Sequence, residues 1–170
     1  MEEKYRINFS APNLVNVCID RRGEGGCEGR LYCGYYPQAI SFYGEYAIIK
    51  IMEKLMDAIN YPQVSTITRC YKQKKFSEKQ EWRRIFSGKE IMKEKGKLAT
   101  LAIYVQYRQN STWQGELFWS ERNMLRHFRS VLELLKLIDQ IAEYREYVMT
   151  EHRTTDYSYK IPKNEGGVVA

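Results

Sequence analysis

The segment from Arg108 to Gln114 brings together side chains that could bind a nucleotide. Within seven residues it contains one guanidinium, three side-chain amides, two hydroxyls and an indole. Such groups can stack on a base and hydrogen-bond its edge or a phosphate. We therefore expect Arg108, Asn110 and Trp113 to contact a ligand. The alternative is structural, with Asn110 forming a turn and Trp113 packing on a sheet.

A second arginine occupies the matching position of an earlier, glycine-rich segment, Arg21 to Gly26. Arg22 aligns with Arg108 when the chain is shifted against itself by 86 residues. Two arginines related in this way could hold a two-fold anionic ligand such as a cyclic dinucleotide. The glycine-rich segment is not a dinucleotide-binding fingerprint, because it precedes a strand pattern instead of opening a helix.

Positive charge is concentrated in residues 69–97. The whole chain has 170 residues, 27 basic and 21 acidic, for a net charge of +6. Residues 69–97 contain 11 of the basic and 4 of the acidic residues, so this segment carries +7 and the remainder −1. A confined basic segment attracts phosphates and other anionic surfaces. The residues expected to bind are Lys74, Lys75, Arg83 and Arg84. A solvated connector kept soluble by its lysines is the alternative.

The same basic segment contains a helix signal. Ser77 is followed three residues later by Gln80, which is a capping-box pattern. Apolar residues then recur at helical spacing from Trp82 to Phe86, and Ser87-Gly88 would end the helix. The pattern predicts a basic amphipathic helix within the connector.

The remaining reactive side chains indicate no particular reaction. The cysteines, Cys18, Cys27, Cys33 and Cys70, lack the spacing of two to four residues that zinc ligands usually have. We interpret them as small buried apolar residues. The two histidines, His127 and His152, form no recognisable arrangement of nucleophile and base. We therefore expect a non-enzymatic protein without a cofactor.

The shift of 86 residues aligns far more than two arginines. The hydrophobic pattern matches over about 42 positions without a gap. The identical pairs are Arg22/Arg108, Gly29/Gly115, Leu31/Leu117, Phe42/Phe128 and Lys50/Lys136. We interpret the match as an internal duplication. Chance alignment of two amphipathic segments is the alternative.

Each repeat is predicted to fold as two strands followed by a helix. In the second repeat, residues 99–107 and 114–119 alternate as strands do, and apolar residues recur every three or four positions from about residue 125 to 148. In the first, strands near residues 15–19 and 28–35 precede a helix at 42–59, which a proline at position 62 ends. The β-branched residues at 64–71 predict a further strand.

These elements predict one α+β domain with pseudo-two-fold symmetry. A hairpin with one helix is marginal alone, so we expect the two sheets to pair edge to edge or the helices to pack together. The predicted division is a first repeat at 5–68, the basic connector at 69–97, a second repeat at 98–149 and a disordered tail at 150–170.

Composition excludes several classes of protein. Hydrophobic residues make up 44% and aromatic residues 14%, with only 11 glycines and 4 prolines, which excludes disordered and collagen-like chains. The apolar runs are shorter than the roughly 20 residues that a membrane helix needs. The start of the sequence shows no secretory signal pattern. We expect a cytoplasmic protein that does not enter a membrane.

Two stretches of the second repeat resemble a group of bacterial proteins. YRQNSTWQG at residues 107–115 and FRSVLEL at 128–134 are similar to a pattern of small, largely uncharacterised proteins of Firmicutes, especially gut clostridia. The similarity covers about residues 97–142, and the residues around Tyr61-Pro62-Gln63 and Thr68-Arg69 are similar to the first half of longer members. The resemblance implies a bacterial cytosolic protein and carries no activity.

Together these patterns favour a non-enzymatic accessory protein that contacts a polyanion, with nucleic acid as the leading candidate. The basic connector would contact phosphates, and the hairpin loops would add stacking or positioning. A protein–protein interaction adaptor and a receptor for a small cyclic nucleotide are the two alternatives.

Overall fold

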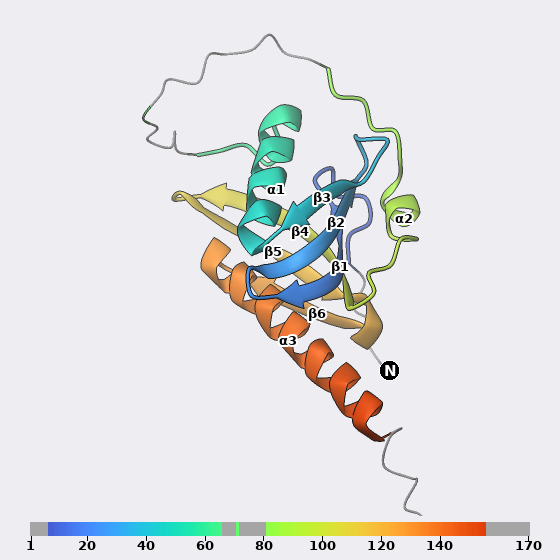
Figure 1. The fold of residues 1–170 in the computed structure, drawn as a ribbon. Coiled ribbons are helices and arrows are strands. Elements are labelled where there is room, and N and C mark those ends of the chain that lie inside the picture. The colour runs from blue at the N-terminus through green and yellow to red at the C-terminus, as the bar shows by residue number, and fades with distance from the viewer. Residues whose placement is uncertain (1–6, 66–70, 72–80, 156–170) are drawn as a thin grey trace, which may run out of the picture.

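The chain folds around one antiparallel sheet of six strands, in the order β3-β2-β1-β4-β5-β6 (Figure 1). The computed structural model describes residues 7–65, 71 and 81–155. The strands are β1 (Val15–Gly23), β2 (Gly26–Cys33), β3 (Ile40–Tyr43), β4 (Ala99–Gln109), β5 (Thr112–Trp119) and β6 (Met124–Phe128). The helices are α1 (Glu45–Ile59), α2 (Gly88–Ile91) and α3 (Val131–Thr155), with a short 3-10 turn, η1 (Ser120–Arg122). The predicted α+β class is confirmed.

The hairpins β1–β2 and β4–β5 have the same register at a constant offset of 86 residues. Val15 pairs with Cys33, and Leu101 pairs with Trp119. Each hairpin has a β-bulge at the corresponding place, after Ile19 in one and after Val105 in the other. The outer strands β3 and β6 show the same offset of 86 residues. Gly29 of β2 pairs with Phe42 of β3, and Gly115 of β5 pairs with Phe128 of β6.

The centre of the sheet is the antiparallel pairing of β1 with β4. Asn16 lies opposite Ala102, and these two residues are themselves 86 positions apart. The helices obey the same offset, since α1 begins at Glu45 and α3 at Val131. The two predicted hairpins therefore join edge to edge into one continuous sheet, which was one of the two expected arrangements.

The outer strands β3 and β6 were missed by the sequence patterns. Residues 42–43 and 125–128 were assigned to the starts of the two helices, and this assignment was wrong. Phe42 and Phe128 face the core and fit a helical face as well as a strand. The break before each helix is local. Gly44 has a φ of 77°, which favours glycine, and Ser130 accepts a hydrogen bond from the backbone of Glu133 at 3.1 Å.

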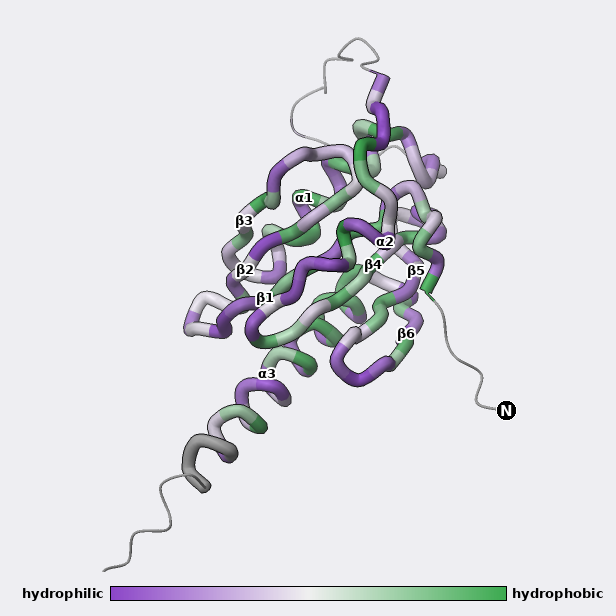
Figure 2. Tube along the Cα trace, turned by 90° about the vertical axis from the view of Figure 1, so that its right-hand side faces the viewer, coloured by the Kyte–Doolittle hydropathy of each residue, from purple (hydrophilic) through white to green (hydrophobic). Residues whose placement is uncertain are grey.

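The main core lies between the sheet and the helices α1 and α3. Both helices cover the same face, and they contact each other there (Figure 1). Figure 2 shows α3 extending beyond the sheet, with hydrophilic and hydrophobic turns alternating along it. The helix continues to Thr155 and so includes the first six residues of the predicted tail, 150–155. The remainder of the predicted tail lies outside the described residues.

The opposite face of the sheet is partly covered by two other segments. Residues 7–14 and the chain around α2 pack a second apolar cluster against the centre of the sheet. Its buried members are Ile7, Ala11, Leu14, Ile91, Ala102 and Tyr104. Toward its margins this face keeps polar residues in contact with solvent.

The predicted helix in the basic connector is not present where the structure describes it. Residues 81–87 form neither a helix nor a strand, and the backbone N–H groups of Ile85 and Phe86 donate to the carbonyl of Gly34. Ser87, expected to end a helix, caps the start of α2 through a capping box with Glu90. The predicted cap at residues 77–80 lies outside the described residues. So does most of the predicted strand at 64–71, of which Val64 forms an isolated bridge to β4.

Candidate anion-binding surface

Arg108, the leading ligand-binding candidate, is buried on the helix side of the sheet. Only 6% of its side chain is exposed, and its Nη1 lies 2.8 Å from Oδ1 of Asp57 on α1. Its Nε donates to the carbonyl of Pro62 at 3.0 Å. These contacts attach the end of β4 to the end of α1 and the loop that follows. We assign Arg108 a structural role.

Arg22 makes the corresponding contacts with the other helix. Its Nη2 lies 3.0 Å from Asp139 and its Nη1 3.4 Å from Glu146, both on α3. Each arginine thus joins a hairpin of one half to the helix of the other half. Because carboxylates already bind both guanidiniums, the two arginines are poorly suited to clamp a two-fold anionic ligand.

The other two ligand-binding candidates in the Arg108–Gln114 segment, Asn110 and Trp113, also have structural roles. Asn110 and Ser111 both have positive φ values, 52° and 59°, as the two central residues of a type I′ hairpin turn require. Trp113 is 7% exposed and belongs to the main core. The structural alternative considered for Asn110 and Trp113 is therefore confirmed.

The described part of the basic connector contains several exposed cations. Lys74 and Lys75 lie outside the described residues. Arg84 is half-buried, and its Nε donates to the carbonyl of Phe86 at 3.0 Å. Arg83 is exposed. Of the four predicted connector residues, Arg83 alone is described as a fully exposed cation.

Four lysines farther along the connector were not among the predicted binding residues. Lys89, Lys93, Lys95 and Lys97 are all exposed. Within the described part of the chain, none of these four lysines lies within ion-pair distance of a carboxylate. We call residues 89–97 the lysine segment. The arginines at positions 21, 22, 30 and 108 on the sheet are, in contrast, all ion-paired.

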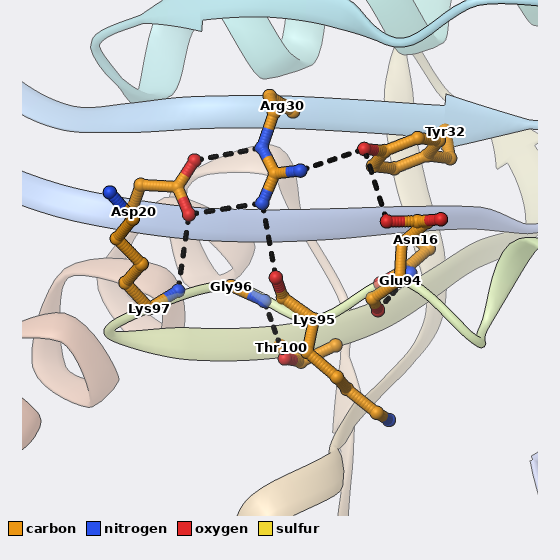
Figure 3. A network of polar contacts seen from close by, with 9 residues as sticks. All are labelled: Asn16, Asp20, Arg30, Tyr32, Glu94, Lys95, Gly96, Lys97 and Thr100. Atoms are coloured by element: carbon orange, nitrogen blue, oxygen red, sulfur yellow. Dashed lines mark hydrogen bonds and ion pairs between the residues drawn. The ribbon is translucent and has the colours of Figure 1, made fainter.

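Polar side chains of the sheet hold the backbone of the lysine segment in place (Figure 3). The side-chain amide of Asn16 donates to the carbonyls of Ile91 and Glu94 at 2.7 and 2.9 Å. Arg30 donates from Nη2 to the carbonyl of Lys95 at 3.0 Å. In Figure 3 the side chain of Lys95 extends away from this guanidinium.

The end of the lysine segment is held equally closely. The N–H of Lys97 donates to Oδ1 of Asp20 at 3.1 Å, and the N–H of Gly96 donates to the hydroxyl of Thr100 at 3.0 Å. A Cβ on Gly96 would lie 2.2 Å from the carbonyl oxygen of Ala99 and 2.6 Å from that of Ile19. Only glycine fits this close approach, so the backbone has one position against the sheet.

The ion pair between Arg30 and Asp20 is the centre of this network. Two guanidinium nitrogens of Arg30 bind the carboxylate at 2.9 and 3.1 Å. Partial burial would raise the pKa of Asp20, but hydrogen bonds from Arg30 and from the Lys97 N–H outweigh burial and lower that pKa. The hydrogen bond to Asp20 raises the pKa of Arg30. Both groups are therefore charged at neutral pH.

The residues of this network were not singled out from the sequence, although a signal for them exists. Asn16, Cys18 and Asp20 alternate with the apolar Val15, Val17 and Ile19 along β1. Such alternation marks the strand face that is not the main core. It does not reveal what covers that face.

The buried thiols do not offer a nucleophile. Burial raises the pKa of Cys18 to about 12, and it raises the pKa of Cys27 and Cys33 as well. All three therefore stay protonated at neutral pH and pack as apolar residues. Over the described ranges, no group of three or more His, Cys, Asp or Glu side chains could hold a metal ion.

A second polar cluster lies on β4, β5 and β6. The hydroxyl of Tyr104 donates to Oε2 of Glu116 at 2.5 Å, and Nδ1 of the exposed His127 lies 3.4 Å from Oε1 of the same carboxylate. Burial and then the contact with Glu116 raise the pKa of Tyr104 to about 12.

Comparison with known proteins adds no name to these features. The chain matches no family model, and no match was found among curated proteins or solved structures. The described helices include none that is both long and apolar enough to cross a membrane. The argument for function therefore depends on the charges and their geometry.

Proposed function

We propose that this protein is a non-enzymatic accessory protein that binds nucleic acid through the lysine segment and Arg83. The observation that carries the proposal is the contrast in pairing of the basic side chains. The arginines at positions 21, 22, 30 and 108 are ion-paired, whereas the exposed lysines of residues 89–97 have no carboxylate within ion-pair distance in the described chain. Unpaired lysines on a fixed backbone are suited to contact successive phosphates.

The fixed backbone strengthens the proposal energetically. Binding by a disordered basic segment would cost the conformational entropy of ordering its backbone. In this chain, Asn16, Asp20 and Arg30 already hold the backbone of residues 91–97. The lysine side chains still lose rotamer freedom on binding, but the backbone does not have to be ordered again.

We also propose that the two halves arose by duplication and form a pseudo-two-fold domain. The support is the constant offset of 86 residues in the strand pairs, in the bulges and in the starts of α1 and α3. Independent hairpins would have no reason to share the position of a bulge. On this proposal the lysine segment lies between the two repeats.

The ion pairs of Arg22 and Arg108 weaken the case for a cyclic-nucleotide receptor. That hypothesis needed both guanidiniums free for a two-fold ligand, and each is bound by a carboxylate of α1 or α3.

The direct test is a salt titration of oligonucleotide binding, measured by fluorescence anisotropy. We expect binding at low ionic strength that weakens linearly on a log–log plot of affinity against salt. Replacing Lys93, Lys95 and Lys97 with alanine should reduce that slope by about 2 for single strands, because three phosphate contacts are lost.

A matched control removes the same charge from the helices. Lys50, Lys54 and Lys136 are also exposed, but they lie on α1 and α3. The triple alanine variant at these positions should keep the wild-type slope. If the wild-type protein shows no salt-sensitive binding to any oligonucleotide, the proposed function is wrong.

A further inference from the structure

An open groove of about 540 Å³ lies beside the end of the lysine segment. Its charged lining consists of Asp20, Arg21, Glu28, Arg30 and Lys97, and its aromatic lining of Phe42 and Tyr43. The volume is within the range of roughly 300–1,000 Å³ that is typical of small-ligand sites. The groove therefore joins the proposed phosphate-binding lysines to a surface with different chemistry.

Three side chains form a row across neighbouring strands in this groove. Arg21 lies opposite Glu28, and Glu28 lies opposite Tyr43 on the edge strand β3. Nη2 of Arg21 is 2.6 Å from the carboxylate of Glu28. Tyr43 is 76% exposed, although its neighbour Phe42 is buried in the core. The buried Phe42 thus anchors β3 in the core, while the neighbouring Tyr43 ring is exposed to solvent.

The mixture of charges in the groove argues against a bare inorganic anion. Asp20 and Glu28 both line it, and their carboxylates would repel a phosphate that offered no hydrogen-bond donor. A nucleotide differs, because it carries a phosphate together with a base whose N–H groups can donate to a carboxylate. Lys97, which has no carboxylate within ion-pair distance in the described chain, supplies a cation beside these acceptors.

We propose that this groove binds an unpaired nucleotide of single-stranded nucleic acid, with its base stacked on Tyr43 and its phosphate beside Lys97. The inference rests on the proposed function and specifies the class of nucleic acid. Stacking on an exposed ring requires a free base face, which a duplex hides within its own base stack. The lysine segment accepts either form, whereas the groove selects the single strand.

The test compares one labelled single strand with a duplex of the same length at fixed salt. We expect the wild-type protein to bind the single strand more tightly. Tyr43→Ala should weaken single-strand binding about 5- to 100-fold, the usual range for losing one stacked base, and leave duplex binding unchanged. Tyr43→Phe keeps the ring and should retain the wild-type affinity.

The matched control is Tyr46→Ala, which removes a ring of similar exposure, 70%, from α1 outside the groove lining. It should bind both oligonucleotides as the wild type does. Thermal melts of all three variants establish that they are folded, as expected for exposed positions.

The outcomes separate the two proposals. Salt-sensitive binding with equal affinity for single strand and duplex, or an unchanged single-strand affinity in folded Tyr43→Ala, overturns the groove and leaves the proposed function standing. An equal loss for both oligonucleotides in Tyr43→Ala also overturns it, because stacking needs a free base. No binding of either oligonucleotide by the wild type overturns both proposals.

Discussion

The two halves of the sheet have the same strand register, but they differ in the polar residues on the face opposite α1 and α3. At the positions of Asp20 and Arg30, the second half has Gln106 and Glu116. The first pair forms an ion pair that binds the backbone of the lysine segment. The second pair contacts the hydroxyl of Tyr104 instead. One framework therefore carries two surfaces, and the side chains decide which half holds the basic segment.

The centre of the sheet shows the same difference at a single pair of positions. Asn16 donates to two carbonyls of the chain around α2, whereas Ala102, directly opposite, packs in the second apolar cluster. A short apolar residue at both positions would leave those two carbonyls without these donors. The asymmetry between the halves is thus built from few substitutions on a shared backbone.

The largest effect in this comparison is expected from the two arginines that join the halves. Arg108→Ala should lower the free energy of unfolding by about 2 kcal/mol, because it removes a buried side chain together with its contacts to the partly exposed Asp57 and to the Pro62 carbonyl. Arg22→Ala should cost about 1 kcal/mol, since its side chain is 29% exposed and its partners are more hydrated. Urea denaturation measures both, and equal losses would contradict the structural assignment.

A comparable effect is expected where the lysine segment meets the sheet. Gly96→Ala should cost about 2 kcal/mol, because the new Cβ meets two backbone carbonyls. It should also weaken oligonucleotide binding by shifting the lysines. Gly25→Ala is the control, as its Cβ would meet nothing within 4 Å, and it should change stability by less than about 0.5 kcal/mol. A stability of Gly96→Ala equal to that of the control would show that the segment is not held tightly.

The smallest effect is expected on how the stability of the protein depends on pH through Asp20 in the first half. Asp20→Asn should cost about 1 kcal/mol at pH 7 by weakening the contact with Arg30. Because the folded state lowers the pKa of Asp20, its stabilisation is complete above the ordinary pKa of about 4 and is lost as pH falls through the lower folded value. The stability difference between wild type and variant should therefore shrink as the pH falls below about 4.

The second half supplies the control for this pH dependence. Gln106→Ala changes the corresponding position, which has no titrating group, and its stability difference from wild type should not follow the titration of Asp20. Urea midpoints at pH 7 and pH 3 measure both variants. A constant difference for Asp20→Asn across this range would contradict the role given to its carboxylate.

Much of the sheet could be predicted because strand periodicity is local. Alternating apolar residues located both hairpins, and the gapless shift of 86 residues aligned positions that have the same register in the sheet. The edge strands were missed because Phe42 and Phe128 fit a helix and a strand equally well. The local pattern alone does not distinguish a helix from a strand when the same residue would face the core in either.

The candidate site was much less predictable than the sheet. Residue type and the repeat alignment made Arg22 and Arg108 ligand-binding candidates, yet their partners on α3 and α1 lie 117 and 51 residues away in sequence. Asp20 and Asn16 are likewise 77 and 75 residues away from the positions of the lysine segment that they hold. Whether an arginine is free to bind a ligand depends on which carboxylates the fold brings to it.

The amino-acid sequence by itself determined the α+β class, the alignment of the two hairpins and the concentration of positive charge in residues 69–97, because each depends on neighbours in the chain. Only the tertiary structure decided which cations are ion-paired, which face of the sheet the lysine segment covers and that Tyr43 is exposed beside it. The physical reason is that electrostatic pairing and burial depend on distance in space, which the sequence does not contain.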